Sequence, residues 1–229
     1  MKHHIPCIQP KAVIFDLDGT LLDTAPDIIA ACNATLEHYG FDHIDEELAR
    51  SKITAGMREL LRLAIPQDKQ DQNMIEGEMR DYFAKYYTDN INVFTKPFEG
   101  MEQLLTDLEK AGIKVAIVTN KYFDMAQKVL SKYSFYQNLS LILGCDSVSN
   151  YKPHPEPILH TLEHLNIGPY DAVYVGDHLN DIMAANRAKV HSAVAMWGYG
   201  PKECGNPNEW HAHFILNSVD ELRQLCLKD

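Results

Sequence analysis

Short apolar runs recur along the chain, separated by longer stretches in which apolar and polar residues mix. Each run is too short for a helix and lacks a clean alternation of apolar and polar positions. Such runs are typical of strands that are buried on both faces of a parallel sheet. The pattern predicts strands at Ala12–Phe15, Val115–Val118, Leu141–Leu143, Ala172–Val175 and Ala193–Met196.

Amphipathic stretches with helical spacing lie between these runs. In Glu99–Gly112 the methionine and the leucines fall on one stripe, and Gly112 stands where a helix C-cap glycine belongs. Pro155–Leu165 and Asp181–Ala188 have the same spacing. The alternation of strands and helices predicts an α/β fold built on a doubly wound parallel sheet.

Residues 24–93 have a different pattern, which is nearly all helical in spacing and contains no convincing strand. A stretch of this length directly after the first strand is longer than an ordinary crossover, so it predicts a helical insertion. The predicted α/β core is therefore 1–23 together with 94–229. Helices are expected within the insertion at Pro26–Tyr39, Glu46–Leu63 and Asp71–Tyr87.

Charge and composition exclude several classes of protein. The 229 residues are 45% hydrophobic and 23% charged, which is ordinary for a globular protein. With 21 basic and 32 acidic side chains the net charge is −11, so neither a nucleic acid nor an anionic membrane is an expected partner. A small phosphorylated metabolite remains a possible ligand, provided that cations gather at one site.

Cysteines and apolar runs indicate the compartment. The five cysteines are odd in number and none forms a CxxC pair, which favours a reducing environment over a disulfide framework. Apolar runs are far shorter than the ~18 residues of a membrane span, and Met1–Pro10 lacks the apolar region of a signal peptide. We expect a cytoplasmic protein, either a monomer or a homodimer.

Two carboxylates follow the first predicted strand. Asp16 and Asp18 project to the same side of the chain, and ligands of open α/β sheets bind at the carboxyl ends of the strands. The two charges repel each other unless a divalent cation lies between them, and oxygen ligands suit Mg²⁺. Gly19 permits the tight turn that follows.

Polar groups also follow the next three strands. Thr119 offers a hydroxyl and, with its neighbours, backbone N–H groups at a helix N-terminus, which suits a phosphate. Lys152 stands ahead of Pro153, which cannot continue a helix. Asp177 ends the fourth strand, and Asp181 on the following helical turn can converge on the same ion.

This set of groups predicts phosphoryl transfer. A phosphomonoester and several carboxylates can share a pocket only if Mg²⁺ and Lys152 offset their charge. One aspartate can then attack phosphorus to form an aspartyl-phosphate, while the other protonates the leaving oxygen and later deprotonates water.

These motifs resemble those of the haloacid dehalogenase (HAD) superfamily. Phe15–Thr24 (FDLDGTLLDT) is similar to its first motif, and Thr119, Lys152 and the Asp177…Asp181 pair match the other three in order. The resemblance implies a Rossmann-like fold in which the helical insertion is a cap domain. Because the dehalogenase branch lacks a second aspartate, the presence of Asp18 favours a phosphatase.

The resemblance also implies a role for each site residue. Asp16 would be the nucleophile and Asp18 the acid/base, with Thr119 and Lys152 holding the phosphate. Asp181 would support the metal ion or Lys152. The implied Mg²⁺ ligands are Asp16, the backbone carbonyl of Asp18, and Asp177. Further expected substrate-binding residues are Gly19, Thr20, Asn120 and Arg58.

The motifs resemble those of two groups of phosphatases with different substrates. Ala25–Asp27 and Trp197–Gly200 are similar to phosphoglycolate phosphatases, whereas Pro153–Pro157 with Trp197–Gly200 also resembles N-acetylmuramic acid 6-phosphate phosphatases. Thr54–Arg58 departs from the form common in the first group, although Arg58 could pair with a substrate carboxylate. We expect 2-phosphoglycolate as the substrate, with N-acetylmuramic acid 6-phosphate, another sugar phosphate or a phosphosugar mutase reaction as alternatives.

A signalling protein is an alternative of another class. Receiver domains of response regulators also use acidic residues, Mg²⁺, a threonine and a lysine to hold an aspartyl-phosphate. They are single compact domains without a long insertion and without an equivalent of Asp18. Both differences favour an enzyme over a signalling module.

Overall fold

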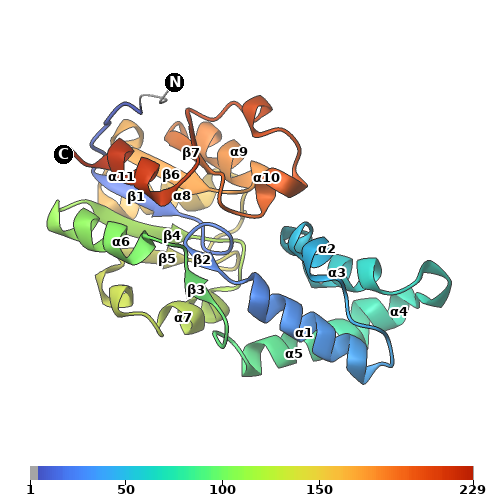
Figure 1. Ribbon diagram of the computed structural model, residues 1–229. Helices are drawn as coiled ribbons and strands as arrows, with labels where there is room; N and C mark the ends of the chain where they lie inside the picture. Colours follow the sequence, from blue (N-terminus) through green and yellow to red (C-terminus); the bar gives the residue numbers. More distant parts are fainter. Residues whose placement is uncertain (1–4, 229) are drawn as a thin grey trace. The chain divides into compact units, whose positions relative to one another are not determined.

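The computed structural model describes residues 5–228, and Figure 1 shows its helices and strands. The first four residues of the Met1–Pro10 segment lie outside this part of the chain. Contacts divide the protein into two compact units, Met1–Leu22 with Pro97–Asp229 (the α/β unit) and Asp23–Lys96 (the helical unit). The sequence predicts residues 24–93 for this insertion. No helix among the described residues is both long enough and apolar enough to cross a membrane.

The α/β unit is built on a six-stranded sheet with the strand order β5-β4-β1-β6-β7-β8, in which every pair is parallel. The chain runs outward from β1 through β4 to β5 and then returns to β6 on the other side of β1. This reversal is the topological switch point at which doubly wound folds bind ligands. The strands are β1 (Ala12–Phe15), β4 (Lys114–Val118), β5 (Leu141–Leu143), β6 (Ala172–Gly176), β7 (His191–Ala195) and β8 (Phe214–Leu216).

The central strands end in register. Phe15 pairs with Ile117 on one side and with Val175 on the other. All four residues of β1 are fully buried, which explains why this strand is an uninterrupted apolar run. The residues that follow β1, β4 and β6 therefore emerge at the same edge of the sheet.

Helices cover both faces of this sheet (Figure 1). On one face, Ile158 and Leu162 of α8 and Ala184 of α9 pack with Ile14 and Tyr174 in one apolar core. On the other face α6 packs against α11. The helices of this unit are α6 (Met101–Lys110), α7 (Phe123–Leu130), α8 (Glu156–Leu165), α9 (Leu179–Ala188), α10 (Gly200–Glu203) and α11 (Val219–Cys226). Short 3₁₀ segments lie at η4 (Ser134–Asn138), η5 (Pro169–Asp171) and η6 (Pro207–Glu209).

The helical unit is more broken than its sequence pattern predicts. A single helix over Glu46–Leu63 is wrong, because the chain turns at Gly56, whose φ of 93° is a conformation that favours glycine. The observed segments are α1 (Ala25–His38), α2 (Glu46–Arg50), η1 (Ile53–Ala55), α3 (Met57–Ala64), η2 (Gln67–Lys69), α4 (Gln72–Met74), the π-helical η3 (Ile75–Met79) and α5 (Arg80–Asp89). Two short strands, β2 (Leu22–Asp23) and β3 (Lys96–Pro97), pair where the chain enters and leaves this unit.

One buried carboxylate joins the two ends of the helical unit. Asp27 on the first turn of α1 is 4% exposed. It accepts hydrogen bonds from the backbone N–H groups of Val93, Phe94 and Thr95, at 3.1, 2.8 and 3.1 Å, and from the Thr95 hydroxyl at 2.6 Å. The Ala25–Asp27 motif thus has a structural reason within this unit, because a carboxylate with this many donors closes the insertion at its base.

Candidate active site

The polar residues predicted at the strand ends meet at one edge of the sheet. Asp16, Thr119 and Asp177 directly follow the last residues of β1, β4 and β6, and the register of these strands places them side by side. Lys152 reaches the same place from the loop after β5, and Asp181 lies on the first turn of α9. Side chains that are far apart in the sequence therefore form one cluster.

Lys152 is the centre of this cluster and is 2% exposed. Its Nζ atom lies 2.8 Å from Oδ1 of Asp16 and 2.7 Å from Oδ1 of Asp181. The Tyr174 hydroxyl at 2.8 Å and the Val118 carbonyl at 3.0 Å complete its surroundings. Burial by itself would lower the pKa of Lys152, but the two carboxylates outweigh burial and raise it. The ammonium group thus stays charged inside the protein.

Asp177 is fully buried, and its two oxygens are held from different sides. Oδ1 accepts a hydrogen bond of 3.1 Å from the Thr20 hydroxyl. Oδ2 accepts bonds of 2.7 and 2.9 Å from the backbone N–H groups of Tyr199 and Gly200. The carboxylate therefore has a fixed orientation. Thr20, which the sequence suggests as a substrate contact, binds Asp177 through its hydroxyl, and its role toward the substrate stays a prediction.

Two glycines make room for Asp177. A Cβ atom on Gly198 would lie 2.3 Å from the Cβ atom of Asp177, and one on Gly19 would lie 2.5 Å from its Oδ2 atom. Neither position can hold a larger residue without displacing Asp177. The indole N–H of Trp197 donates to the Thr20 carbonyl at 3.0 Å and thereby joins the Trp197–Gly200 segment to the loop after β1. This segment, known from the sequence only as a resemblance, surrounds Asp177.

Three buried carboxylates are placed to hold a metal ion. Asp16, Asp177 and Asp181 each offer an oxygen, and these atoms lie within 4.8 Å of one another. Burial raises the pKa of Asp16 to about 6, although Lys152 opposes the shift. Burial, together with the charges of Asp181 and Asp16, raises the pKa of Asp177 to about 7. Lys152 thus does not neutralise the cluster completely, and a set of hard oxygen donors with excess negative charge fits a divalent cation.

Asp181 and Asp18 are both predicted at the metal site, but their side chains have different partners. Asp181 accepts hydrogen bonds on both oxygens, from Lys152 and Tyr174 on Oδ1 and from the His178 N–H on Oδ2. It therefore fixes Lys152 and lies beside the other two carboxylates at the same time. The side chain of Asp18 is not in the metal cluster and instead binds Lys121, whose Nζ atom lies 2.9 Å from each of its oxygens.

The Thr119–Lys121 segment contacts both Lys152 and Asp18. The Thr119 hydroxyl accepts a hydrogen bond of 3.2 Å from the Lys121 N–H, and the Asn120 side chain donates to the Lys152 carbonyl at 3.0 Å. The expected helix N-terminus at Thr119 is wrong, because α7 begins only at Phe123. Sequence reasoning also missed Lys121 and Tyr174. Lys121 follows Thr119 closely, but its partner becomes visible only when β1 and β4 lie side by side.

Comparison with known proteins assigns this arrangement to a family. The family model described as haloacid dehalogenase-like hydrolase matches residues 13–195, which is most of the chain and includes every member of the cluster. The chain belongs to the haloacid dehalogenase-like hydrolases. The resemblance carried by the motifs is therefore confirmed, and so is the expected α/β core.

Relatives of this HAD hydrolase are phosphatases with two different names. The chain is 36% identical to the N-acetylmuramic acid 6-phosphate phosphatase of Pseudomonas putida over 215 residues, which cover 94% of this chain and 95% of that protein. It is 39% identical to the phosphoglycolate phosphatase of Xylella fastidiosa over 207 residues, which cover 90% and 89%. The protein is accordingly an enzyme of the phosphatase type, which favours catalysis over receiver-like signalling.

Solved structures support the same fold. A crystal structure from Haemophilus somnus, described as a predicted phosphoglycolate phosphatase, superposes with a TM-score of 0.86 at 24% identity and covers 96% of this chain and 99% of its own. A HAD-superfamily hydrolase of subfamily IA from Geobacter sulfurreducens has a TM-score of 0.72 at 27% identity, with 96% and 97% covered. The likeness therefore extends over both units of the chain.

Arg58 lies on α3 of the helical unit, away from the strand ends in the sequence. Its Nε atom is 2.7 Å from Oε2 of Glu76, and its side chain is about half exposed. The pair is accessible to solvent, so exchanging Glu76 for a substrate carboxylate would cost little. A role in substrate binding stays a prediction for this residue.

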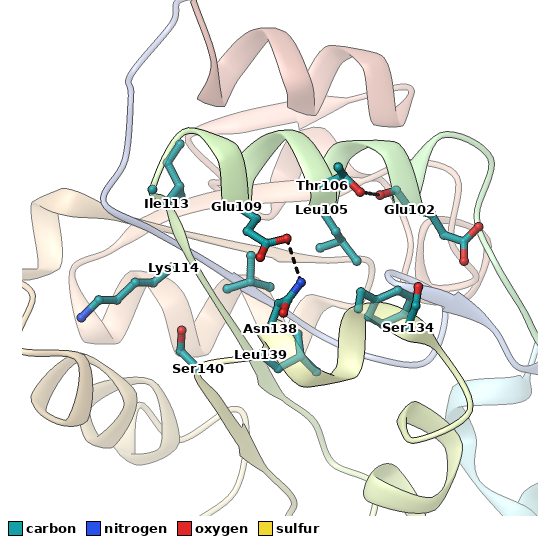
Figure 2. Close-up of a pocket in the computed structure, with 13 residues that line it drawn as sticks. Glu102, Leu105, Thr106, Glu109, Ile113, Lys114, Ser134, Asn138, Leu139 and Ser140 are labelled. Carbon is teal, nitrogen blue, oxygen red and sulfur yellow. Dashed lines mark hydrogen bonds between the residues drawn. The ribbon is translucent and has the colours of Figure 1, made fainter.

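A separate cavity of about 440 Å³ lies in the α/β unit between α6, the start of β4 and η4 (Figure 2). Leu105, Ile113 and Leu139 line it together with polar groups, among them Glu109, which accepts a hydrogen bond of 2.7 Å from Asn138. None of the described residues that line it belongs to the carboxylate cluster. The chemistry predicted from the sequence is therefore not located in this cavity.

Proposed function

We propose that this HAD phosphatase is a Mg²⁺-dependent phosphomonoesterase that hydrolyses a small phosphorylated metabolite through an aspartyl-phosphate on Asp16. The observation that carries the proposal is the buried cluster in which Asp16 lies beside the Lys152 ammonium and two further carboxylates. Within residues 5–228, hydrogen bonds to the Asp16 side chain reach only its Oδ1 atom. One carboxylate oxygen is thereby kept available for reaction.

Asp16, Asp177 and the backbone carbonyl of Asp18 would hold the Mg²⁺ ion, with Asp181 beside them. When bound, the ion would offset the charge of the carboxylates and of the phosphate oxygens, which allows an anion to approach an anion. The Thr20 hydroxyl and the N–H groups of Tyr199 and Gly200 keep Asp177 oriented for this purpose.

In the first half of the reaction, a carboxylate oxygen of Asp16 attacks phosphorus. The new O–P bond forms as the bond between phosphorus and the leaving oxygen breaks, and Asp18 gives its proton to that oxygen. Lys152 and Thr119 hold the phosphoryl oxygens. The ammonium of Lys152 is already in place for this role because Asp181 and Tyr174 fix it.

In the second half, Asp18 takes a proton from water, and the resulting hydroxide attacks phosphorus. The bond between Asp16 and phosphorus breaks, inorganic phosphate leaves, and the carboxylate of Asp16 is restored. Two easier steps thus replace one difficult hydrolysis. Each step needs the same two aspartates, which stand two residues apart at the end of β1.

We propose 2-phosphoglycolate as the substrate and glycolate with phosphate as the products. The Xylella fastidiosa relative named phosphoglycolate phosphatase supports this choice, and Arg58 offers an exposed cation for a substrate carboxylate. N-acetylmuramic acid 6-phosphate is the second candidate, because the Pseudomonas putida relative with that name covers 94% of this chain at 36% identity.

Release of inorganic phosphate from a panel of compounds tests the proposal. The panel contains 2-phosphoglycolate, N-acetylmuramic acid 6-phosphate and common sugar phosphates, each measured with Mg²⁺ and with EDTA. We expect Mg²⁺-dependent release, highest for 2-phosphoglycolate. Preference for the amino-sugar phosphate would select the second candidate, an isomerised sugar phosphate would indicate a mutase, and no turnover of any compound would contradict the phosphomonoesterase.

We further propose that the enzyme works in the cytoplasm as a monomer or homodimer. All five cysteines are free thiols, and two of them, Cys32 and Cys226, are buried, which suits a reducing compartment. Fractionation of cells with an antibody to the protein, and light scattering of the purified enzyme, test the two statements separately.

A further inference from the structure

The ion pair between Lys121 and Asp18 differs from the surface ion pairs of the α/β unit. The Lys121 side chain is 9% exposed and that of Asp18 is 23% exposed, and Nζ is 2.9 Å from both carboxylate oxygens. Lys11 and Asp171 form a pair of similar length, 2.8 Å, but are 68% and 44% exposed. Water screens the second pair much more than the first, so the Lys121 pair restrains its partner more strongly.

The backbone of Lys121 is fixed on both sides. Its N–H donates to the Thr119 hydroxyl at 3.2 Å, and its carbonyl accepts a hydrogen bond of 3.0 Å from the Cys145 N–H. The residue is thereby attached to the end of β4 and to the loop after β5. The backbone that carries its ammonium group is therefore held in a defined position.

Asp18 depends on this ammonium group for its orientation. Among residues 5–228, Lys121 supplies the hydrogen bonds found for the Asp18 carboxylate. An ammonium that binds both oxygens restricts rotation of the carboxylate about its Cβ–Cγ bond. Proton transfer to a leaving oxygen requires hydrogen-bond geometry, so a misplacement of this carboxylate slows the transfer.

We propose that Lys121 is a positioning residue that holds the carboxyl group of Asp18 for proton transfer to the leaving group: one oxygen stays bound to the Lys121 ammonium, while the other carries the proton that Asp18 took from water in the preceding turnover and gives it to the leaving oxygen. The inference rests on the proposed phosphomonoesterase function and adds a residue to it. Lys152 then serves the nucleophile and Lys121 serves the acid/base, so each of the two aspartates after β1 has its own lysine.

The test compares two substrates that differ in their need for a proton. Phenyl phosphate has a poor leaving group that requires protonation, whereas 2,4-dinitrophenyl phosphate releases a stable anion without it. Formation of the phosphoenzyme is followed as the pre-steady-state release of the phenol in the Mg²⁺-loaded full-length enzyme. This readout separates the first half-reaction from the later attack of water, which also uses Asp18.

In Lys121→Met, release of phenol should slow about 100-fold, with the KM for phenyl phosphate nearly unchanged. The burst of dinitrophenolate should stay close to the wild-type rate and then be followed by slower steady turnover. Lys121→Arg keeps the charge and should restore part of the phenol rate. Lys11→Met, which removes the exposed pair with Asp171, is the matched control and should behave as the wild type.

Equal slowing of both bursts, or a rise in KM with an unchanged rate constant, would overturn the proposal, because it would make Lys121 a structural or substrate-binding residue. Unchanged rates for both substrates in Lys121→Met would overturn it as well. If Lys121→Met does not fold, the same comparison in Lys121→Arg decides, since an altered geometry should affect phenyl phosphate selectively. Failure of the wild-type enzyme to hydrolyse either compound, together with no turnover in the metabolite panel, would instead contradict the phosphomonoesterase itself.

Discussion

Charged side chains are used differently in the two units of this phosphatase. In the α/β unit, Lys152 is 2% exposed and joins two carboxylates that are themselves nearly inaccessible. In the helical unit, Arg58 and Arg62 share Glu76 in pairs that are about a quarter to half exposed. Breaking a buried pair costs about 3–5 kcal/mol, whereas an exposed pair contributes about 0–1 kcal/mol.

The buried pairs of the α/β unit suit the proposed reaction, whereas the exposed pairs of the helical unit suit the choice of substrate. Well-packed apolar residues would stabilise the fold as well as buried charges do, so the buried cluster is best explained by the reaction proposed for it. The exposed pairs of the helical unit can be exchanged at little cost. A family can therefore keep one reaction and change its substrate through such positions.

The largest effect is expected for Asp16→Asn, which keeps the shape of the nucleophile but removes its charge. Turnover should fall by about 10⁴-fold or more. The melting temperature should stay the same or rise, because Lys152 keeps Asp181 as its buried partner and burial already disfavours the ionised form of Asp16. Asp171→Asn, an exposed aspartate of the same unit, is the control. Retained turnover in Asp16→Asn would place the nucleophile elsewhere.

Lys152→Met tests how much the buried ion pairs contribute to stability. It leaves Asp16 and Asp181 without their shared cation, so the free energy of unfolding should fall by about 3–5 kcal/mol, and phosphatase activity should be lost. Urea denaturation with and without Mg²⁺ measures the change. A loss below about 1 kcal/mol, typical of surface pairs, would show that the cluster is not buried in solution.

Metal binding should depend steeply on pH. The pKa is raised to about 6 for Asp16 and to about 7 for Asp177, from an ordinary value of 3.8. At a pH between the ordinary and the raised values, the folded protein without metal therefore binds more protons than the unfolded protein. Its stability therefore falls as pH rises through this window, and a metal ion must displace the protons at low pH.

Mg²⁺ affinity should consequently increase about 1,000-fold between about pH 5 and about pH 8, since both carboxyl groups must lose a proton. Calorimetric titration at several pH values, with the number of protons released per ion, measures this dependence. Affinity that is constant over the range, with no proton release, would contradict the proposed ligands.

A smaller effect is expected for Thr20→Val, which removes the hydroxyl that binds Oδ1 of Asp177 and keeps the volume of the side chain. Mg²⁺ affinity should fall about 10-fold, as for other groups that orient a metal ligand. The control is Thr161→Val, which removes an equally buried hydroxyl that donates to the Pro157 carbonyl in α8. Equal effects of the two variants on affinity would show that orientation of Asp177 is unimportant.

The smallest effect is expected for Arg58, which forms an exposed ion pair in the helical unit. Arg58→Ala should change stability by less than about 0.5 kcal/mol and raise the KM for 2-phosphoglycolate while leaving kcat nearly unchanged. Arg80→Ala removes another exposed ion pair of the same unit, with Asp81, and serves as the control. If both variants match the wild type in KM, Arg58 does not bind the substrate.

The core and the clustering of the polar groups at the strand ends could be predicted because they depend on local patterns. Fully buried strands appear as apolar runs, and the residue after each run is placed by the parallel sheet. The break at Gly56 could not be foreseen, since one glycine within a helical pattern is compatible with a continuous helix.

Contacts between residues far apart in the sequence could not be predicted either. Lys121 and Tyr174 act on residues 103 and 22 positions away, on Asp18 and Lys152, so their roles exist only in the folded sheet. The Trp197–Gly200 segment was visible as a motif, but its hydrogen bonds to Asp177 and Thr20 were not. Motifs therefore predicted the clustered residues better than the groups that hold them.

The most direct test of the account is the detection of a phosphoryl group on Asp16. The enzyme is quenched in acid during turnover with Mg²⁺, and the peptide that contains residue 16 is analysed by mass spectrometry. The account predicts the mass of one phosphoryl group on Asp16 that forms and decays as fast as the enzyme turns over. Turnover with Asp16 unmodified, or with the phosphoryl group on another residue, would contradict it.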